Sequence, residues 1–296
     1  MDKKGENKEY ESINELITAV LNDYSSWETE AFPWFRGEPG ASEAVFDPLL
    51  PKLYRPVDGK KYLENRLLQQ FRLKAPGLGL GETPPMERTD QWLFLAQHVG
   101  LPTRLLDWTE GLLLALHFAL DFDQPIIWML DPYELNRLSL VPGEEPNVFS
   151  LTWLDYPGAV ASKKDIYRSL QPELHLGHWR GLEEMMTHPN PANINIRAAW
   201  EDARDTMGTI YPYAILPTYV HSRMSAQKSC FTIWGTDQRP LVSMEKINER
   251  ILRRYVIAQK STKRMRTELR LLGVTHISLF SDLDRLAKDL KDVWLE

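Results

Sequence analysis

An arginine and a glycine, Arg36 and Gly37, follow the apolar residues Trp34 and Phe35 near the start of the chain. A guanidinium at the end of an apolar strand can bind a phosphate bidentately, and a following glycine lets a ligand approach the backbone. Arg36 with Gly37 is therefore a candidate anion clamp. The structural alternative is an arginine paired with a buried carboxylate, and this segment alone leaves both interpretations open.

A second candidate region is the polar segment 97–109, which lies between two apolar stretches. Polar groups next to a low-dielectric wall are unfavourable unless they are paired or used in chemistry. His98 is either a general base or a structural histidine. Arg104 and Asp107 can form a structural ion pair. Asp107 can instead orient a ligand hydroxyl, or act as the N-cap of the next helix.

The third region begins with Arg223 and Gln227, four residues apart. If a strand runs from Gln227 to Ile233, alternation places Gln227, Ser229 and Phe231 on one face. The alternative is a sheet edge with its polar residues in solvent, but that arrangement would also expose Phe231.

Composition and motifs exclude several classes of protein. The 296 residues are 43% hydrophobic with a formal charge of −6, which fits a globular protein and disfavours one whose whole surface binds nucleic acid. Cys230 is the single cysteine, and His175 and His178 have no matching ligand cluster, so we expect no metal site. No phosphate-binding glycine loop is present. The charged N-terminus and the short apolar run 111–120 predict a cytoplasmic protein that does not contact a membrane.

Periodicity and turn residues predict an α+β fold with a mixed central sheet flanked by helices. The predicted helices are 12–25, 58–74, 89–99, 109–120, 194–206, 260–272 and 281–294. The predicted strands are 32–36, 125–130, 213–216 and 231–234. Residues 1–29 are expected to form an N-terminal helical segment before one domain over 30–290. Residues 136–210 contain none of the three candidate regions, so we predict a helical insertion there.

The three regions also resemble motifs of one family, the FRG domain. Phe35-Arg36-Gly37 resembles the motif that gives the family its name. Residues 97–109 resemble its central motif and continue into Ala115-Leu116-x-Phe118-Ala119. Arg223 to Gln227, leading to Phe231-Thr232, resembles the third motif, and residues 272–284 resemble the family's C-terminal ending. The resemblance covers roughly residues 30–290.

The order of these motifs is similar to that in ADP-ribosyltransferases of the Arg-Ser-Glu type. This similarity implies a split sheet, NAD as cofactor, and a carboxylate or other acceptor that steadies the positive charge formed as nicotinamide leaves. The implied catalytic residues are Asp107, Gln227 and Thr109. The implied cofactor-binding residues are Arg36, Gly37, His98, Thr103, Arg104 and Arg223. Gln227 is neutral where the similarity implies a catalytic acid, which makes Asp107 the candidate for that charge.

Three functions compete on these residues. The first is an NAD-dependent ADP-ribosyltransferase that modifies a protein, RNA or DNA acceptor, as a toxin or anti-phage defence effector with a neutralising antitoxin protein as partner. The second is a non-catalytic module in which Arg36, Arg104 and Arg223 bind a nucleotide or nucleic acid. The third is a phosphodiesterase or nuclease using His98 and Asp107, which lacks a second carboxylate or histidine pair.

Overall fold

The computed structural model of the chain describes residues 8–27, 32–40, 49–78, 83–86, 89–138, 149–150, 212–217, 219, 222–234, 238–244, 246–280, 287 and 290–291. Within these residues no helix is both long enough and apolar enough to cross a membrane. The predicted helices 194–206 and 281–294 lie outside the described residues in whole or in large part, as does most of the predicted insertion 136–210.

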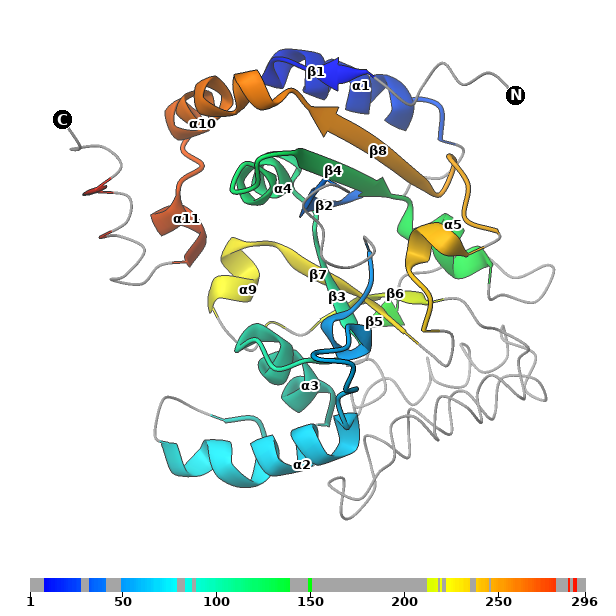
Figure 1. Cartoon of the computed structure of the whole chain (residues 1–296), viewed down its shortest axis with the longest axis vertical. Helices are drawn as coiled ribbons and strands as arrows, with labels where there is room; N and C mark the ends of the chain where they lie inside the picture. The colour runs from blue at the N-terminus through cyan, green and yellow to red at the C-terminus, as the bar shows by residue number, and fades with distance from the viewer. Residues whose placement is uncertain are drawn as a thin grey trace, which may run out of the picture.

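The described strands form one eight-stranded sheet in the order β1-β8-β4-β2-β3-β7-β6-β5 (Figure 1). The pairs β1–β8 and β5–β6 are parallel and the other neighbours are antiparallel, so the sheet is mixed, as predicted. The strands are β1 (Glu9–Tyr10), β2 (Trp34–Pro39), β3 (Leu105–Thr109), β4 (Pro125–Leu130), β5 (Phe149–Ser150), β6 (Tyr213–Leu216), β7 (Ser229–Ile233) and β8 (Leu252–Ile257).

Helices lie around this sheet (Figure 1). They are α1 (Ile13–Tyr24), α2 (Glu64–Lys74), α3 (Thr89–His98), α4 (Leu112–Ala119), α5 (Pro132–Arg137), α9 (Ser222–Ala226), α10 (Thr262–Leu271) and α11 (His276–Phe280), with short 3-10 turns η1 (Lys52–Tyr54), η2 (Ala75–Leu78), η5 (Leu241–Ser243) and η6 (Gln259–Ser261). The α+β class expected from the sequence is confirmed.

Alternating side chains give the sheet two cores. In β4, Ile127 and Met129 face α1, α4 and α10, whereas Ile126, Trp128 and Leu130 pack with Leu106 and Trp108 of β3 on the other face. Successive side chains of a strand point to opposite faces, so a strand that is apolar at every position must be covered on both sides. The central strands are therefore rigid supports for anything attached to them.

Helix α4 packs directly on β2, and Gly37 makes this possible. A Cβ at position 37 would lie 2.6 Å from the Ala119 nitrogen and closer still to the Ala115 carbonyl oxygen. Any side chain at position 37 would push the helix away from the strand. The sequence suggested that this glycine opens the backbone to a ligand. The space that a Cβ would take is filled by α4, and the ligand contact at this glycine stays a prediction.

Several predicted elements are confirmed and others are wrong at their boundaries. Helix α1 begins after Ser12, whose Oγ accepts a hydrogen bond from the Glu15 nitrogen, as the capping pattern predicted. The strand predicted at 32–36 extends through Gly37 to Pro39. The helix predicted from residue 58 begins only at Glu64, because Asp58 and Gly59 form a tight turn with φ values of 50° and 74°.

The central motif is the largest correction to the secondary structure. The end of the segment expected as a polar loop is strand β3, and the helix predicted from Thr109 begins at Leu112 with Gly111 as its N-cap. The N-cap interpretation of Asp107 is therefore wrong, because Asp107 occupies the middle of a strand. Regular alternation in β3 explains how a carboxylate and the apolar Leu106 and Trp108 can be neighbours.

Strands β2 and β3 pair only at Phe35 and Thr109, whereas β2 and β4 pair over six residues. The sheet is continuous, and the split of the ADP-ribosyltransferase type stays a prediction. The single pair nevertheless leaves room for side chains between the two strands on one side of Phe35, and Arg36 lies there.

Candidate functional site

A cavity of about 440 Å³ opens where β2 and β3 diverge. Its floor is formed by two antiparallel pairs, Asp107 with Phe231 and Thr109 with Ser229. The end of α4, together with α3, α9, α11 and η1, supplies the walls. The volume is within the range of about 300–1,000 Å³ that small-molecule sites occupy. The lining residues are Phe35, Arg36, Gly37, Lys52, Gln97, His98, Asp107, Trp108, Thr109, Phe118, Asp121, Phe122, Arg223, Met224, Gln227, Ser229, Phe231 and Phe280.

The guanidinium of Arg36 is held from two sides. Its Nε donates to Glu38 Oε1 at 2.7 Å, and its Nη1 donates to the backbone oxygen of Asp107 at 2.7 Å. Glu38 is buried, and its other oxygen accepts a hydrogen bond from the Leu49 nitrogen at 3.0 Å. Leu49 has a φ of 56°, a conformation that costs about 1–2 kcal/mol for an L-residue unless its surroundings impose it. The arginine is thus fixed by a buried network.

The structural interpretation of Arg36 is confirmed, and the anion clamp stays a prediction. Arg36 is paired with a buried carboxylate, as the structural alternative stated, and it also lines the cavity with 18% of its side chain exposed. Among the described residues its Nη2 has no hydrogen-bond partner. A ligand oxygen can therefore bind to Nη2 without displacing Glu38.

Asp107 is the exposed acid of the cavity floor. Its Oδ2 accepts a hydrogen bond from Gln97 Nε2 at 2.7 Å and lies 3.9 Å from Arg36 Nη1. Gln97 is fixed in turn by Thr103, whose Oγ1 donates to Gln97 Oε1 at 2.5 Å. The carboxylate therefore has a defined orientation although 55% of the side chain is exposed. A preorganised charge of this kind is suited to stabilising a developing positive charge.

The turn between α9 and β7 contributes to another wall of the cavity. Gln227 lies in this turn and not in a strand, and its Nε2 donates to the Leu279 oxygen of α11 at 3.3 Å. Thr109 Oγ1 donates to the backbone oxygen of Gln227 at 2.7 Å and accepts from the Gly111 nitrogen at 3.1 Å. Lys228, the next residue, has a φ of 46°. Strained backbone at a cavity wall is typical of functional sites.

These contacts change the expected role of Thr109. Its hydroxyl proton is already donated to Gln227, and the residue is buried. We therefore assign Thr109 to positioning of the wall and not to chemistry. The expectation that Gln227, Ser229 and Phe231 share a face is met in that all three line the cavity.

Arg104, expected to bind cofactor, is absent from the cavity lining. It is buried and bidentate on Glu64, with Nη2 2.6 Å from Oε2, and its Nη1 donates to the Trp234 oxygen. The proposed ion pair of Arg104 with Asp107 is wrong for the same reason. Thr103 is also buried, behind Gln97. Neither residue reaches a ligand in the cavity.

The expected residues His98 and Arg223 do line the cavity, and aromatic rings surround them. The Arg223 guanidinium lies 5.0 Å from the centre of the Phe280 ring, and Phe118 meets Phe280 edge to face at 6.0 Å. Phe35, Phe122 and Phe231 complete the apolar surface. Flat aromatic faces beside cationic groups suit a ligand that has both a planar ring and phosphate.

A second arginine adds positive charge beside Arg36. Burial lowers the pKa of Arg55, and the nearby Arg36 lowers it further, while Glu38 and Asp107 oppose this shift. Arg55 donates from Nε and Nη2 to the Leu50 oxygen, at 2.8 and 2.5 Å. Lys52, one turn earlier, lines the cavity itself. The rim next to Asp107 is therefore basic.

The part of the chain that builds β2, α3, β3 and α4 can be compared with known families. Residues 32–125 match the FRG domain. This match supports the FRG family for these residues, which contain the FRG motif itself, the central motif and Glu38. The walls from α9, β7 and α11 lie beyond the matched range. No curated protein and no solved structure matches the chain, and a similarity to ADP-ribosyltransferases is not found.

Sequence reasoning missed several lining residues. Lys52 lies outside the motifs, Phe122 follows the end of the central motif, and Phe280 lies within the C-terminal ending. None of the three was singled out, and only the tertiary structure shows that they line one cavity. Glu38 and Gln97 stood inside the motifs, but no pattern showed that Glu38 binds Arg36 or that Gln97 binds Asp107. The signal available for Gln97 was its position in the sequence. It lies ten residues before Asp107, near the end of a helix after which the chain must reverse direction.

Proposed function

We propose that the protein is an NAD-dependent ADP-ribosyltransferase that modifies a macromolecular acceptor. The observation that carries the proposal is the Asp107 carboxylate, which Gln97 orients into the cavity beside Arg36. An acid that lines a cavity and whose orientation is fixed by a neighbouring side chain is a candidate for chemistry, because a preorganised charge can stabilise a transition state.

The residues of the cavity fit NAD. Arg36 Nη2 has no partner among the described residues and can serve the pyrophosphate, and the Phe118 and Phe280 side chains line the cavity as apolar surface for a planar base or nicotinamide. Arg223 and His98 supply further polar contacts at the wall. When bound, NAD supplies the ADP-ribosyl group and the nicotinamide leaving group.

The transfer balances without a further reactant. The bond between the ribose carbon and the nicotinamide nitrogen breaks, a bond from that carbon to an acceptor oxygen or nitrogen forms, and nicotinamide and one proton are released. Asp107 places negative charge in the cavity, where it stabilises a transition state that gains positive charge. Gln227 can add a hydrogen bond but no charge, which makes Asp107 the catalytic residue of the proposal.

Single-turnover nicotinamide release at saturating NAD tests this assignment. Loss of a preorganised charge lowers a rate by about two to three orders of magnitude. We expect Asp107→Asn to show that loss with nearly unchanged NAD affinity, because asparagine keeps the shape of the side chain. Asp123→Asn, an exposed change outside the cavity, is the matched control. An Asp107→Asn protein that releases nicotinamide at the wild-type rate contradicts the proposal.

A non-catalytic nucleotide-binding module is the second candidate, and the neutral Gln227 favours it. Such a module binds NAD but does not release nicotinamide. Asp107→Asn then changes neither the NAD affinity nor the rate of nicotinamide release. A role as toxin or anti-phage effector, with an antitoxin protein as partner, would extend the first candidate and depends on which acceptor is modified.

A further inference from the structure

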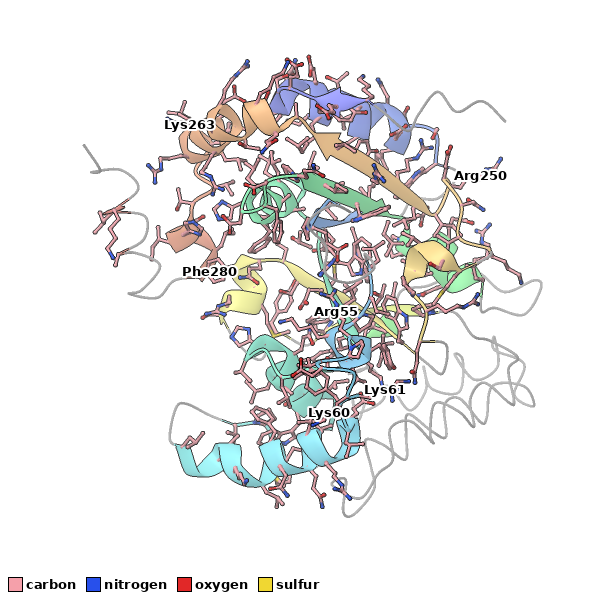
Figure 2. The ribbon with its side chains drawn as sticks, viewed as in Figure 1. Arg55, Lys60, Lys61, Arg250, Lys263 and Phe280 are labelled. Atoms are coloured by element: carbon pink, nitrogen blue, oxygen red, sulfur yellow. The ribbon has the colours of Figure 1, made fainter. Side chains whose placement is uncertain are left out.

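A basic segment leaves the cavity rim and ends in a rigid turn at the surface. We define it as residues 52–62, which contain four basic residues and one acid in a chain whose formal charge is −6. The basic residues are Lys52, Arg55, Lys60 and Lys61. Lys52 lines the cavity, and Arg55, Lys60 and Lys61 follow along the same stretch in Figure 2.

The segment is anchored to the fold at its first end. The nitrogen of Leu53 donates to the Thr103 oxygen at 3.3 Å, and the Leu53 side chain is buried. Arg55 is tied to the Leu50 oxygen. Because Thr103 also holds Gln97, the segment begins on the same support as Asp107. Its position relative to the cavity is therefore fixed.

The second end is a two-residue hairpin with a defined shape. Val57 and Lys60 exchange both backbone hydrogen bonds, at 3.0 and 2.9 Å. Asp58 and Gly59 between them both have positive φ, as a type I′ turn requires. The hairpin itself is fully at the surface, and Lys60, Lys61 and Tyr62 are exposed. Such a turn fixes the backbone from which Lys60 and Lys61 project into solvent.

The lysines are available for a ligand. In the part of the chain that the structure describes, Lys52, Lys60 and Lys61 form no ion pair, whereas Lys260 and Arg266 elsewhere on the surface do. The one acid within the segment, Asp58, lies in the turn. Tyr62 keeps 37% of its surface exposed directly after the two lysines. Cations in a row with an exposed aromatic ring are the two components of sites for single-stranded nucleic acid.

We infer that the basic segment docks a single-stranded nucleic acid, so that a nucleic acid is the acceptor of the reaction at the neighbouring cavity. That the nucleic acid is the acceptor rests on the proposed function. The docking of the strand is argued from the geometry of the segment alone. The backbone phosphates lie along Lys52, Lys60 and Lys61, a base stacks on Tyr62, and the strand leads toward the cavity rim. An acidic protein partner is the competing occupant.

The experiment compares charge reversal on the segment with the same reversal elsewhere in the full chain. The test variant is Lys60→Glu with Lys61→Glu. The control is Arg250→Glu with Lys263→Glu, which changes the net charge equally at two exposed sites that lie apart from the hairpin in Figure 2. The probe is a fluorescent 20-nucleotide single strand of mixed sequence, as DNA and as RNA, titrated by anisotropy over a range of salt concentrations.

We expect the wild type and the control to bind the strand, and the test variant to bind at least about tenfold more weakly. Each lost phosphate contact lowers the slope of log K against log salt by about 0.7, so the test variant loses about 1.4. The inference is overturned if the wild type does not bind the strand, or if all three proteins bind it alike. Lys60→Ala with Lys61→Ala repeats the test if the reversal disturbs folding.

Nicotinamide release without acceptor is measured on the same three proteins. It should be equal in all of them, because Lys60 and Lys61 lie outside the cavity. If the strand binds as expected but no protein releases nicotinamide, the enzymatic proposal fails and the docking surface stands. If nicotinamide is released but strand binding does not depend on Lys60 and Lys61, the transferase proposal stands and the nucleic-acid acceptor is rejected.

Discussion

The two arginine–glutamate pairs of the matched FRG region have similar geometry and different surroundings. Arg36 lies 2.7 Å from Glu38, and Arg104 lies 2.6 Å from Glu64. The Arg36 side chain keeps 18% of its surface exposed and borders the cavity, whereas that of Arg104 keeps 2% and does not. The same pairing therefore serves to present one guanidinium to a ligand and to bury the other.

The partners explain the difference. Glu64 uses both oxygens on Arg104, which leaves that guanidinium enclosed and bonded to Trp234 as well. Glu38 gives one oxygen to Arg36 and the other to the Leu49 backbone, and Arg36 lines the cavity with no partner at Nη2 among the described residues. A bidentate partner makes an arginine structural, and a shared partner leaves it able to bind.

Breaking the enclosed pair should have the largest effect on stability. Arg104→Ala leaves Glu64 as a nearly buried charge without its partner. Removing one partner of a buried ion pair lowers the free energy of unfolding by about 3–5 kcal/mol. We expect a decrease of that size in the free energy of unfolding, measured by urea denaturation, with NAD affinity unchanged in the folded protein. Replacing both residues, as Arg104→Met with Glu64→Leu, should recover most of the stability. A midpoint equal to that of the wild type would show that the pair contributes nothing.

Breaking the cavity-facing pair should instead mainly affect the ligand. Arg36→Gln removes a charged donor to the pyrophosphate, and hydrogen bonds to charged groups contribute about 1.5–3 kcal/mol. We expect NAD affinity to fall about 10- to 100-fold by calorimetric titration. The loss of stability should be smaller than for Arg104→Ala, because the glutamine Nε2 takes the place of Arg36 Nε and can still donate a hydrogen bond to Glu38. Arg36→Lys retains the charge but cannot contact Glu38 and Asp107 together, so intermediate binding is expected. A large loss of stability with unchanged affinity would make Arg36 purely structural.

The sequence identified locally patterned helices and strands better than elements held by distant partners. Periodicity predicted β4, β6, α3 and α10 because their apolar residues recur at regular intervals. Strand β8, with the sequence Leu-Arg-Arg-Tyr-Val-Ile, went unnoticed because two adjacent arginines interrupt its alternation. One of them, Arg253, pairs with Asp23 at the end of α1, 230 residues away. Long-range partners of this kind leave no local signal.

The lack of a local signal for distant partners also affected the roles assigned to the site residues. Arg36 and Arg104 are both arginines beside apolar strands in FRG motifs, so sequence reasoning gave both the same role. Their roles differ because Glu64, on α2, reaches Arg104 across 40 residues, whereas the partner of Arg36 is two residues away in the same strand. Asp107 was recognised because it is the acid within the central motif, although its strand was expected to be a loop.

The smallest expected effect comes from making each glutamate neutral while keeping its shape. Glutamine has one acceptor oxygen, so Glu38→Gln must present an amide NH₂ either to Arg36 Nε or to the Leu49 nitrogen, both of which are donors. Glu64→Gln meets the same conflict at the two nitrogens of Arg104, and it serves as the matched control. Both variants should lose about 1–2 kcal/mol in the free energy of unfolding.

The two variants should differ in ligand binding. In Glu38→Gln the guanidinium of Arg36 keeps its bond to the Asp107 oxygen but is less firmly oriented, and we expect NAD affinity to fall about three- to fivefold, roughly 0.6–1 kcal/mol. In Glu64→Gln the affinity should not change, because Arg104 does not reach the cavity. Calorimetric titration of both proteins, at a temperature where each is fully folded, gives the comparison. Equal losses of affinity in the two proteins would mean that Glu38 acts only through general stability and does not position Arg36.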